Sequence, residues 1–526
     1  MTQRFSFTAI LALACVLALV RPSTADDASG TIAYPAALRS DATQAFFGTT
    51  VHDPYRWMEQ THSAEVKRWV SAQMVLTSRV LSRIPQADFF RSTIVHMRSK
   101  VDAMPEVGKY ASVFLAKAGT LNVTRNGTTQ VLLDPEKRWK APMSLADFEL
   151  SPDGLELAYA TEIAGNGWVR WRALSTITGA DIPGEVVGTR DWGELSWAQD
   201  CSGFYYGGYG SEKPRANGTP VGEGYQTRFH RLGTLQSQDV LIYERPDRPN
   251  LFPYAYESLD GRYLILGTSG GEASDANMLL IRDKHTERRL VATIRPPGDS
   301  SYQFINNIGT EFYFLSNYDA SAGKVVKLNL RDPDHAINVV PQTSEILGSV
   351  TAIGDRMVAH YFRDAASDLV VFDYSGKALH RISLPGLGGT TDMTATKGSS
   401  GYFMFSSPTM PPTTYAYNVS MNASTVYSQR PAPFNTSDYV TDECFAPSTG
   451  GVKVPVFVGH RRGLKLDGRT PTLIYGYGSL GEFLQPMWQD FTAAWLELTR
   501  FRGYFPSYGE RIHHGKASYI PPGVPA

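Results

Sequence analysis

Hydrophobic residues recur along most of this chain in short runs that end at glycine-containing turns. Seven turn glycines are each followed by aromatic or β-branched residues, at intervals of 45 to 58 residues. These glycines are Gly108, Gly154, Gly203, Gly261, Gly309, Gly354 and Gly401. A repeat of about 40–50 residues made of short strands and turns is typical of a β-propeller. The pattern therefore predicts seven blades, and the alternative is an irregular all-β domain whose glycines are spaced by chance.

Near the N-terminal end the apolar positions change to helical spacing. One face of a helix from about Ser63 to Arg83 would carry the residues Val66, Trp69, Val70, Gln73, Leu76, Val80 and Ile84. Ser63 suits the N-cap position, and Pro85 is expected to end the helix. The pattern predicts an amphipathic helix that packs on a larger body.

The first 25 residues are predicted to be a secretory signal peptide. Arg4 supplies a positive start, Phe5 to Val20 is apolar apart from two residues, and Ser23 to Ala25 offers a small-residue cleavage site. The apolar run is short for a membrane span. We expect export to a periplasm or to the outside, with a mature chain that begins near Asp26 and no membrane attachment. An uncleaved anchor is the alternative.

Composition and charge narrow the classes of function. The 526 residues leave room for two domains or more, and the 47 Gly and 27 Tyr agree with a β-rich fold. A net charge of −1 gives no reason to expect a nucleic acid partner. Cys201 and Cys444 are expected to be independent core thiols. No Cys/His cluster has metal-ligand spacing, so neither a metal nor a cofactor is expected.

Two apolar runs close to the C-terminal end predict strands of a different domain. Val452 to Val458 is β-branched, and Pro455 inside it predicts an edge position. Leu473 to Tyr475 predicts a buried strand, which runs into the closely spaced glycines of Tyr475-Gly476-Tyr477-Gly478 and hence into a tight loop. Two strands and a glycine-rich loop are how an α/β-hydrolase sheet begins.

This C-terminal stretch resembles the entry to the catalytic domain of the prolyl oligopeptidase family of serine peptidases. The resemblance rests on Gly463 to Gly468 followed by Tyr475 to Gly478, and near the N-terminus on Asp53 to Trp57 followed by Trp69, Val70 and Gln73. Two positions depart from the family pattern, namely Met74 and Leu480, and Leu480 stands near the expected proline pocket. The resemblance covers roughly residues 31–498.

The resemblance implies a β-rich multidomain protein in which a seven-bladed β-propeller is inserted into an incomplete α/β-hydrolase domain. The expected divisions are a signal peptide at 1–25, an N-terminal helical extension of the hydrolase domain at 26–100, the propeller at 101–441, the start of the hydrolase domain at 442–498 and an aberrant tail at 499–526. One hypothesis for the tail is a frameshift near residue 498, and the alternatives are a natural short form or an assembly artefact.

By resemblance, the intact enzyme is a serine-type oligopeptidase that cleaves short peptides, and Tyr477 donates its hydroxyl to the oxyanion. The family places its Ser, Asp and His beyond the loop that carries Tyr477. Ser211, Ser400 and Ser479 each lack the flanking glycines of a nucleophile elbow. No triad member is therefore assigned, and this chain is expected to be an inactive monomer. The alternative is a propeller that binds partners without catalysis.

Overall fold

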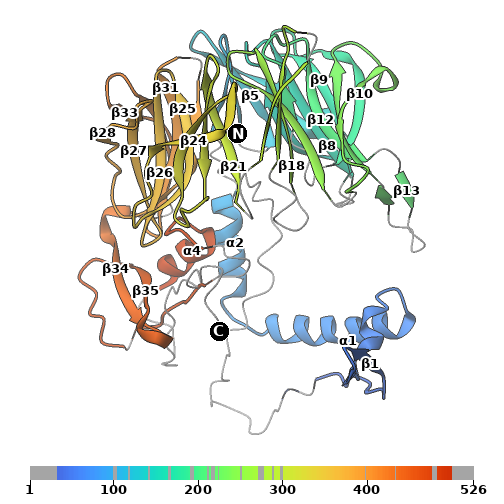
Figure 1. The fold of residues 1–526 in the computed structure, drawn as a ribbon. Coiled ribbons are helices and arrows are strands. Elements are labelled where there is room, and N and C mark those ends of the chain that lie inside the picture. The colour runs from blue at the N-terminus through green and yellow to red at the C-terminus, as the bar shows by residue number, and fades with distance from the viewer. Residues whose placement is uncertain are drawn as a thin grey trace.

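The computed structural model describes residues 32 and 34–499 with internal gaps, the longest at 99–103, 190–194, 215–219, 270–277 and 477–482. Seven antiparallel sheets of four or five strands form a β-propeller, which confirms the prediction of seven blades (Figure 1). The predicted signal peptide and nearly all of the predicted tail lie outside the described residues.

The first four blades follow one another along the chain. Blade 1 consists of β3 (Glu106–Val107), β4 (Ser112–Leu115), β5 (Leu121–Arg125) and β6 (Thr128–Leu133), followed by α3 (Pro135–Arg138). Blade 2 consists of β7 (Met143–Leu150), β8 (Glu156–Ile163), β9 (Trp168–Ser175) and β10 (Asp181–Thr189). Blade 3 consists of β11 (Ser196–Trp197), β12 (Gly203–Tyr209), β15 (Tyr225–Arg231) and β16 (Val240–Glu244), with the hairpin β13 (Glu212–Pro214) and β14 (Pro220–Gly222) inserted. Blade 4 consists of β17 (Phe252–Glu257), β18 (Tyr263–Ser269), β19 (Leu279–Asp283) and β20 (Arg289–Ile294).

The last three blades complete the ring. Blade 5 consists of β21 (Tyr302–Ile308), β22 (Glu311–Ser316), β23 (Lys324–Asn329) and β24 (Asp332–Val340). Blade 6 consists of β25 (Ile346–Ile353), β26 (Arg356–Arg363), β27 (Ala366–Asp373) and β28 (Ala378–Arg381). Blade 7 consists of β29 (Gly389–Thr390), β30 (Thr394–Ala395), β31 (Ser400–Ser407), β32 (Met410–Asn418) and β33 (Ala423–Gln429).

The repeated glycines lie at or beside the start of the strand that is second in the sheet order of each blade. Gly154, Gly261, Gly309 and Gly354 have φ values of 80°, 71°, 60° and 57°. This left-handed conformation is costly for residues with a Cβ atom, which explains why glycine recurs there. The spacing in the sequence is therefore the spacing of the blades.

The hydrophobic core of the propeller is divided among the gaps between blades. Six clusters of buried side chains each span two neighbouring blades, as Ile265 of blade 4 and Phe312 of blade 5 illustrate. Among the residues that the structure describes, no such cluster joins blade 7 to blade 1. Between blade 7 and the segment that leads into blade 1, Thr391 Oγ1 donates a hydrogen bond to Met104 Sδ at 3.5 Å. Each blade is thus stabilised mainly by its neighbours in the sequence.

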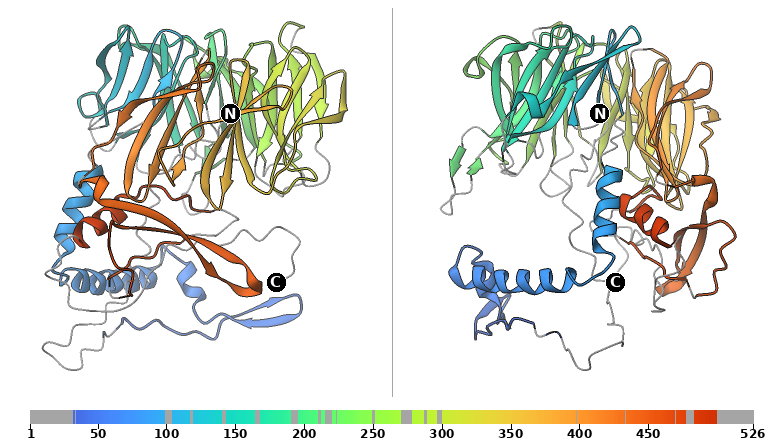
Figure 2. Two further views of the ribbon diagram at one scale, coloured as in Figure 1. Left: turned by 90° about the vertical axis from the view of Figure 1, so that its left-hand side faces the viewer. Right: turned by 180° about the vertical axis from the view of Figure 1, so that it is seen from behind.

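Apart from the single turn α3 and the short 3-10 helices of the propeller, the helices lie on one side of the propeller, as Figure 2 shows from two directions. Helix α1 (Ala64–Leu81) matches the predicted helix, and Ser63 caps it by accepting a hydrogen bond from the Val66 amide at 3.2 Å. None of the described helices is long and apolar enough to cross a membrane. A second helix that was not predicted, α2 (Ala87–Arg98), follows Pro85.

The N-terminal motif is held against α1. It comprises β1 (Thr43–Phe46), β2 (Thr49–His52) and the 3-10 helix η1 (Arg56–Glu59). The Trp57 ring meets the Trp69 ring edge to face at 6.2 Å, and Trp57 Nε1 donates to the Leu38 carbonyl at 2.7 Å. These residues, which carry the resemblance at this end, therefore form one local packing unit.

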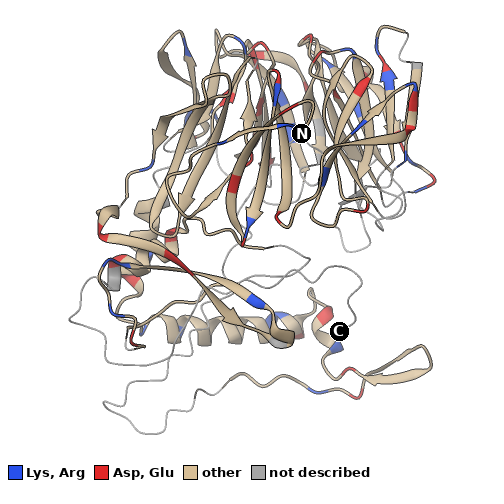
Figure 3. Cartoon of the chain, turned by 60° about the vertical axis from the view of Figure 1, so that its left-hand side comes forward, with Lys and Arg blue, Asp and Glu red and all other residues tan. Residues whose placement is uncertain are grey.

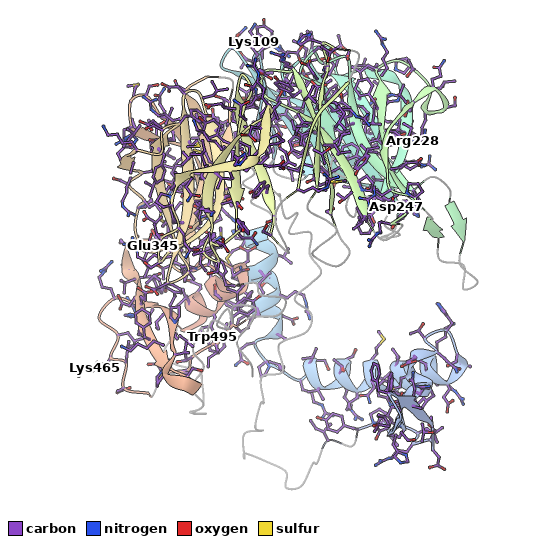
Figure 4. All side chains as sticks on the ribbon, in the orientation of Figure 1. Lys109, Arg228, Asp247, Glu345, Lys465 and Trp495 are labelled. Carbon is purple, nitrogen blue, oxygen red and sulfur yellow. The ribbon has the colours of Figure 1, made fainter. Side chains whose placement is uncertain are left out.

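The C-terminal part, residues 439–499, packs against α2. It contains the hairpin β34 (Tyr439–Pro447) and β35 (Lys453–Arg461) and helix α4 (Asp490–Thr499). Trp495 of α4 stacks on Phe90 of α2 with ring centroids 6.1 Å apart (Figure 4). Segments that precede and follow the propeller in the sequence therefore lie together, as expected for an inserted propeller.

Two expectations about this part are corrected. Leu473 to Tyr475 forms no strand, because neither β34 nor β35 pairs with it, and Ile474 remains 38% exposed. Residues 441 and 442, between which a domain division was expected, both lie in β34. Cys201 and Cys444 are both free, but Cys444 is exposed on β34 and is not a core thiol.

Candidate functional site between the propeller and the C-terminal part

A short segment fixes the C-terminal part to the propeller. We call Phe483–Gln489, which leads into α4, the docking segment. The Phe483 ring meets the Phe362 ring of blade 6 edge to face at 4.6 Å. The Trp488 amide donates to Ser406 Oγ of blade 7 at 3.1 Å. The docking segment therefore contacts two neighbouring blades.

Gly389 of blade 7 makes room for this segment. A Cβ atom at Gly389 would lie 2.5 Å from Met487 Cγ and 2.7 Å from Gln485 Oε1. Both distances are shorter than van der Waals contact, so a side chain there would displace the docking segment. The glycine is needed here for close approach and not for a turn.

A second polar contact of the docking segment with the propeller is made at Ser367 of β27. Ser367 Oγ lies 2.9 Å from Gln485 Oε1 and 2.8 Å from His360 Nε2, and it accepts a hydrogen bond from the Thr390 amide at 2.8 Å. His360, Thr390 and Ser367 are all buried. One hydroxyl of the propeller therefore joins three strands of blades 6 and 7 to the docking segment.

An aspartate completes this network on the far side of the imidazole. Asp392 Oδ1 lies 3.1 Å from His360 Nδ1 and accepts a hydrogen bond from Ser349 Oγ at 2.5 Å. Burial by itself would raise the pKa of Asp392, but the hydrogen bonds from His360 and Ser349 outweigh it and lower the pKa. Ser367, His360 and Asp392 thus have the connectivity of a Ser-His-Asp triad, which sequence reasoning missed because no local motif links the three.

The setting of Ser367 differs from that of a hydrolase nucleophile. A nucleophile elbow exposes the serine on a sharp turn between a strand and a helix, beside N–H groups that receive the oxyanion. Ser367 lies within a strand of a blade and is only 9% exposed. The Thr390 N–H points at the serine oxygen itself. The arrangement is better suited to holding strands together than to attacking a substrate.

Sequence reasoning also missed one Gly-x-Ser-x-Gly string, Gly267 to Gly271. Its serine, Ser269, is the last residue of β18 and pairs with Phe252 of β17, whose carbonyl accepts from Ser269 Oγ at 3.4 Å. A Cβ atom at Gly267 would lie 2.4 Å from the hydroxyl oxygen of Tyr254, so this glycine has a packing role in the blade. The described residues of this string, Gly267 to Ser269, belong to the propeller strand β18.

The serines that lack the flanking glycines of an elbow lie elsewhere. Ser400 begins β31 in blade 7, whereas Ser211 and Ser479 lie outside the described residues. In the part of the chain that the structure describes, no group of three or more His, Cys, Asp or Glu residues could hold a metal ion.

Tyr477, the expected oxyanion donor, also lies outside the described residues. The residue two positions before it, Tyr475, meets Phe491 of α4 edge to face at 5.3 Å. Tyr475 also lines a cavity of about 40 Å³, whose other walls include Pro408, Phe457, Gln485, Met487 and Thr492. Tyr475 therefore lies at the face between blade 7 and the C-terminal part.

A second connection lies where the chain leaves the propeller. Arg430, just after β33, forms an ion pair with Asp490 at 2.9 Å and also donates to the Met97 carbonyl of α2. Asp490 accepts a further hydrogen bond from Trp488 Nε1 at 3.0 Å. Arg430 is largely buried, so this ion pair is shielded from solvent. Arg430 therefore connects the chain that follows blade 7 to both α2 and α4.

Comparisons with known proteins agree with this arrangement. The family model described as "Prolyl oligopeptidase, N-terminal beta-propeller domain" matches residues 34–430. A prolyl endopeptidase of Elizabethkingia meningoseptica is 30% identical over 480 residues, which cover 89% of this chain and 67% of the relative. A solved prolyl endopeptidase, from a study of inter-domain dynamics in catalysis and specificity, has a TM-score of 0.78 at 26% identity and covers 88% of this chain and 70% of its own.

A further solved structure shows the same fold. It is prolyl oligopeptidase B from Galerina marginata bound to a 25-residue macrocyclization substrate, with a TM-score of 0.77 at 20% identity. The match covers 88% of this chain and 70% of that one. At this level of identity the likeness concerns the fold alone.

Proposed function

Because this chain belongs to the prolyl oligopeptidase family, we propose that its propeller and C-terminal part form two walls of a chamber that admits short peptides. The observation that carries the proposal is the docking segment, which seats the C-terminal part on blades 6 and 7. Two of the proteins named above are prolyl endopeptidases. Proline-containing oligopeptides are therefore the substrate class proposed for an intact enzyme of this kind.

Within that enzyme, Tyr477 is proposed to donate its hydroxyl to the oxyanion. A phenolic hydroxyl is a suitable donor where it is held rigidly, and the loss of one such donor costs about 10²–10³-fold in rate. The packing of Tyr475 on Phe491 supports the proposal because it anchors the start of the loop. The hydroxyl needs a nucleophile beside it before it can act in catalysis.

This stretch of 526 residues is proposed not to hydrolyse peptides by itself. Ser269 lies in a blade strand, and Ser367 is buried beneath the docking segment. Ser367 does not lie on the strand–turn–helix elbow that serine hydrolases of this fold use. These two settings support the absence of a competent nucleophile from this stretch of chain.

Two assays on the purified chain test this proposal. A chromogenic prolyl peptide reports turnover, and a fluorophosphonate probe reports any serine that reacts as a nucleophile. We expect neither release of the chromophore nor labelling. Ser367→Ala and Ser269→Ala are the matched variants: turnover that disappears in one of them would refute the proposal and identify the nucleophile.

A second candidate function is a propeller that binds peptides without cleaving them. All seven blades and six interfaces between blades are present in the described residues, so this part has the core of a complete domain. Titration calorimetry with a prolyl peptide distinguishes the two functions. Binding that leaves the peptide intact favours the binding module, whereas cleavage excludes it.

The location of the protein, its lack of a nucleic acid partner and its oligomeric state are proposed from its sequence and charge. Export through the signal peptide at 1–25 would place it in a periplasm or outside the cell, free of the membrane after cleavage. Basic and acidic residues are interspersed along the chain of the propeller (Figure 3), which supports a protein without a nucleic acid partner. A monomer is proposed, and sedimentation of the purified chain tests it.

A further inference from the structure

We propose that Gln485 and Ser367 form a latch that sets how readily the C-terminal part separates from the propeller. Their contact is 2.9 Å long and joins residues 118 positions apart in the sequence. His360 and Asp392 hold the serine side of the latch in place. This inference rests on the observed contacts and does not depend on whether the chain cleaves peptides.

The hydrogen-bond capacity of Ser367 explains why it can serve as the centre of the latch. A serine hydroxyl has one proton and accepts two hydrogen bonds. Ser367 takes one from the Thr390 amide, and the other two directions point to His360 and Gln485. All of the capacity of the hydroxyl is therefore used when the docking segment is seated.

Gln485 is suited to this position in either protonation state of the histidine. If His360 carries protons on both nitrogens, it donates to Asp392 and to Ser367, and the serine proton goes to the amide oxygen of Gln485. If His360 Nε2 is unprotonated, it accepts the serine proton, and Gln485 turns its amide to donate instead. A glutamine can make either contact, because its amide carries both an acceptor oxygen and donor N–H groups.

Apolar contacts lie on both sides of the latch, in which Ser367 is buried and Gln485 is half-buried. Phe483 packs on Phe362, which itself packs against the His360 ring with centroids 4.4 Å apart. Met487 fills the space over Gly389. A hydrogen bond is electrostatically stronger in such surroundings, and a partner left unpaired there is more costly. Loss of Gln485 should therefore weaken the seating of the whole segment.

Hydrogen exchange of the full chain, without substrate, tests the latch. Gln485→Leu and Ser367→Ala are each expected to speed exchange of the amides in residues 486–497 by about tenfold, the usual effect of removing one buried hydrogen-bond partner. Gln489→Leu is the matched control, because Gln489 lies in the same segment and lines the cavity without reaching Ser367. This control should exchange as the unaltered protein does.

A third variant tests the apolar side of the latch. Gly389→Ala places a methyl group where Met487 and Gln485 now lie, and it should speed exchange in the same residues while the strands of blades 2 to 4 stay protected. Circular dichroism confirms that each variant is folded. If Ser367→Ala fails to fold, Gln485→Leu carries the test, because it leaves the propeller unaltered.

Two outcomes would overturn the latch. The first is unchanged exchange in Gln485→Leu, or an equal change in Gln489→Leu. The second is labelling of Ser367 by the fluorophosphonate probe in the unaltered protein, because a reactive, accessible serine is not a buried latch. Absence of peptide turnover, by contrast, concerns only the proposed function and leaves the exchange result intact.

Discussion

At the scale of single residues, the same three side chains can serve catalysis or structure, and their surroundings decide which. Ser367, His360 and Asp392 are connected as in a triad, but the serine is buried in a strand and its oxygen already accepts an amide hydrogen bond. A catalytic serine needs access and an empty oxyanion site. Connectivity alone therefore does not identify an active site.

The acidic member of this group gives a prediction about pH. The pKa of Asp392 is lowered: burial would raise it, but hydrogen bonds from His360 and Ser349 favour the carboxylate. A lowered pKa in the fold means that this group contributes stability above its ordinary pKa of about 3.9, and that the contribution is lost as the pH falls through the folded value. Asp392→Asn should cost about 1–3 kcal/mol of unfolding free energy at pH 7.

Urea unfolding at several pH values checks this prediction. The curves of Asp392→Asn and of the unaltered chain should approach one another as the pH falls below about 3.9. Asp334→Asn on β24 is the control, because Asp334 is exposed and its replacement should change stability little at any pH. A constant difference between Asp392→Asn and the unaltered chain at all pH values would contradict the assignment.

At the scale of elements, the sequence predicts what is local and misses what depends on distant partners. The cap at Ser63 and the turn glycines are local signals, and the structure confirms them. The strand expected at Leu473 to Tyr475 is absent because a strand needs a neighbour to pair with, and no hydrophobic pattern supplies one. The docking segment was missed for a related reason, since its partners lie on two blades far away in the sequence.

The start of α1 offers a test of a local signal. Ser63→Ala removes the hydrogen bond to the Val66 amide and should destabilise the first turn by about 1 kcal/mol, which corresponds to roughly fivefold faster exchange of the amides near it. Ser71→Ala, on an exposed site in the middle of the same helix, should not weaken it, because alanine is the better helix former. Equal effects of the two changes would show that Ser63 is not the cap.

The turns of the blades offer a second test at this scale. Gly376 and Gly309 both have positive φ, 88° and 60°, but a Cβ atom at Gly376 would lie 1.8 Å from the Val339 carbonyl oxygen, whereas nothing lies within 4 Å at Gly309. Gly309→Ala should cost about 1 kcal/mol from backbone strain alone. Gly376→Ala adds a clash with backbone and should cost about 2–4 kcal/mol.

Urea unfolding midpoints measure this difference between the two glycines. Gly376→Ala should lower the midpoint clearly more than Gly309→Ala does, because only the first displaces the neighbouring strand β24 of blade 5. Similar midpoints would mean that the backbone at Val339 of blade 5 can shift at little cost in stability. That result would contradict close packing between blades 5 and 6.

At the scale of the whole molecule, the propeller and the parts beneath it differ in how they are stabilised. Each blade buries side chains against the next in an unbroken series of six clusters from blade 1 to blade 7. The C-terminal part has one cluster, shared with α2, and exposes apolar side chains such as Phe445 and Ile474. Helix α1 likewise exposes Met74 and Val75. The propeller should therefore be the most stable unit.

Limited proteolysis tests this order of stability. We expect a protease to leave a resistant core of roughly residues 100–430, because cleavage requires local opening and the blade strands from Glu106 to Gln429 open least. Mass spectrometry of the fragments over time identifies what is lost first, and residues of α1 and of the C-terminal part should precede any blade. Gln485→Leu should hasten the loss of the C-terminal part and leave the core as resistant as before, since the latch is the contact that this change removes. If the blades were cut before residues 439–499, the interfaces between neighbouring blades would not be what holds this protein together.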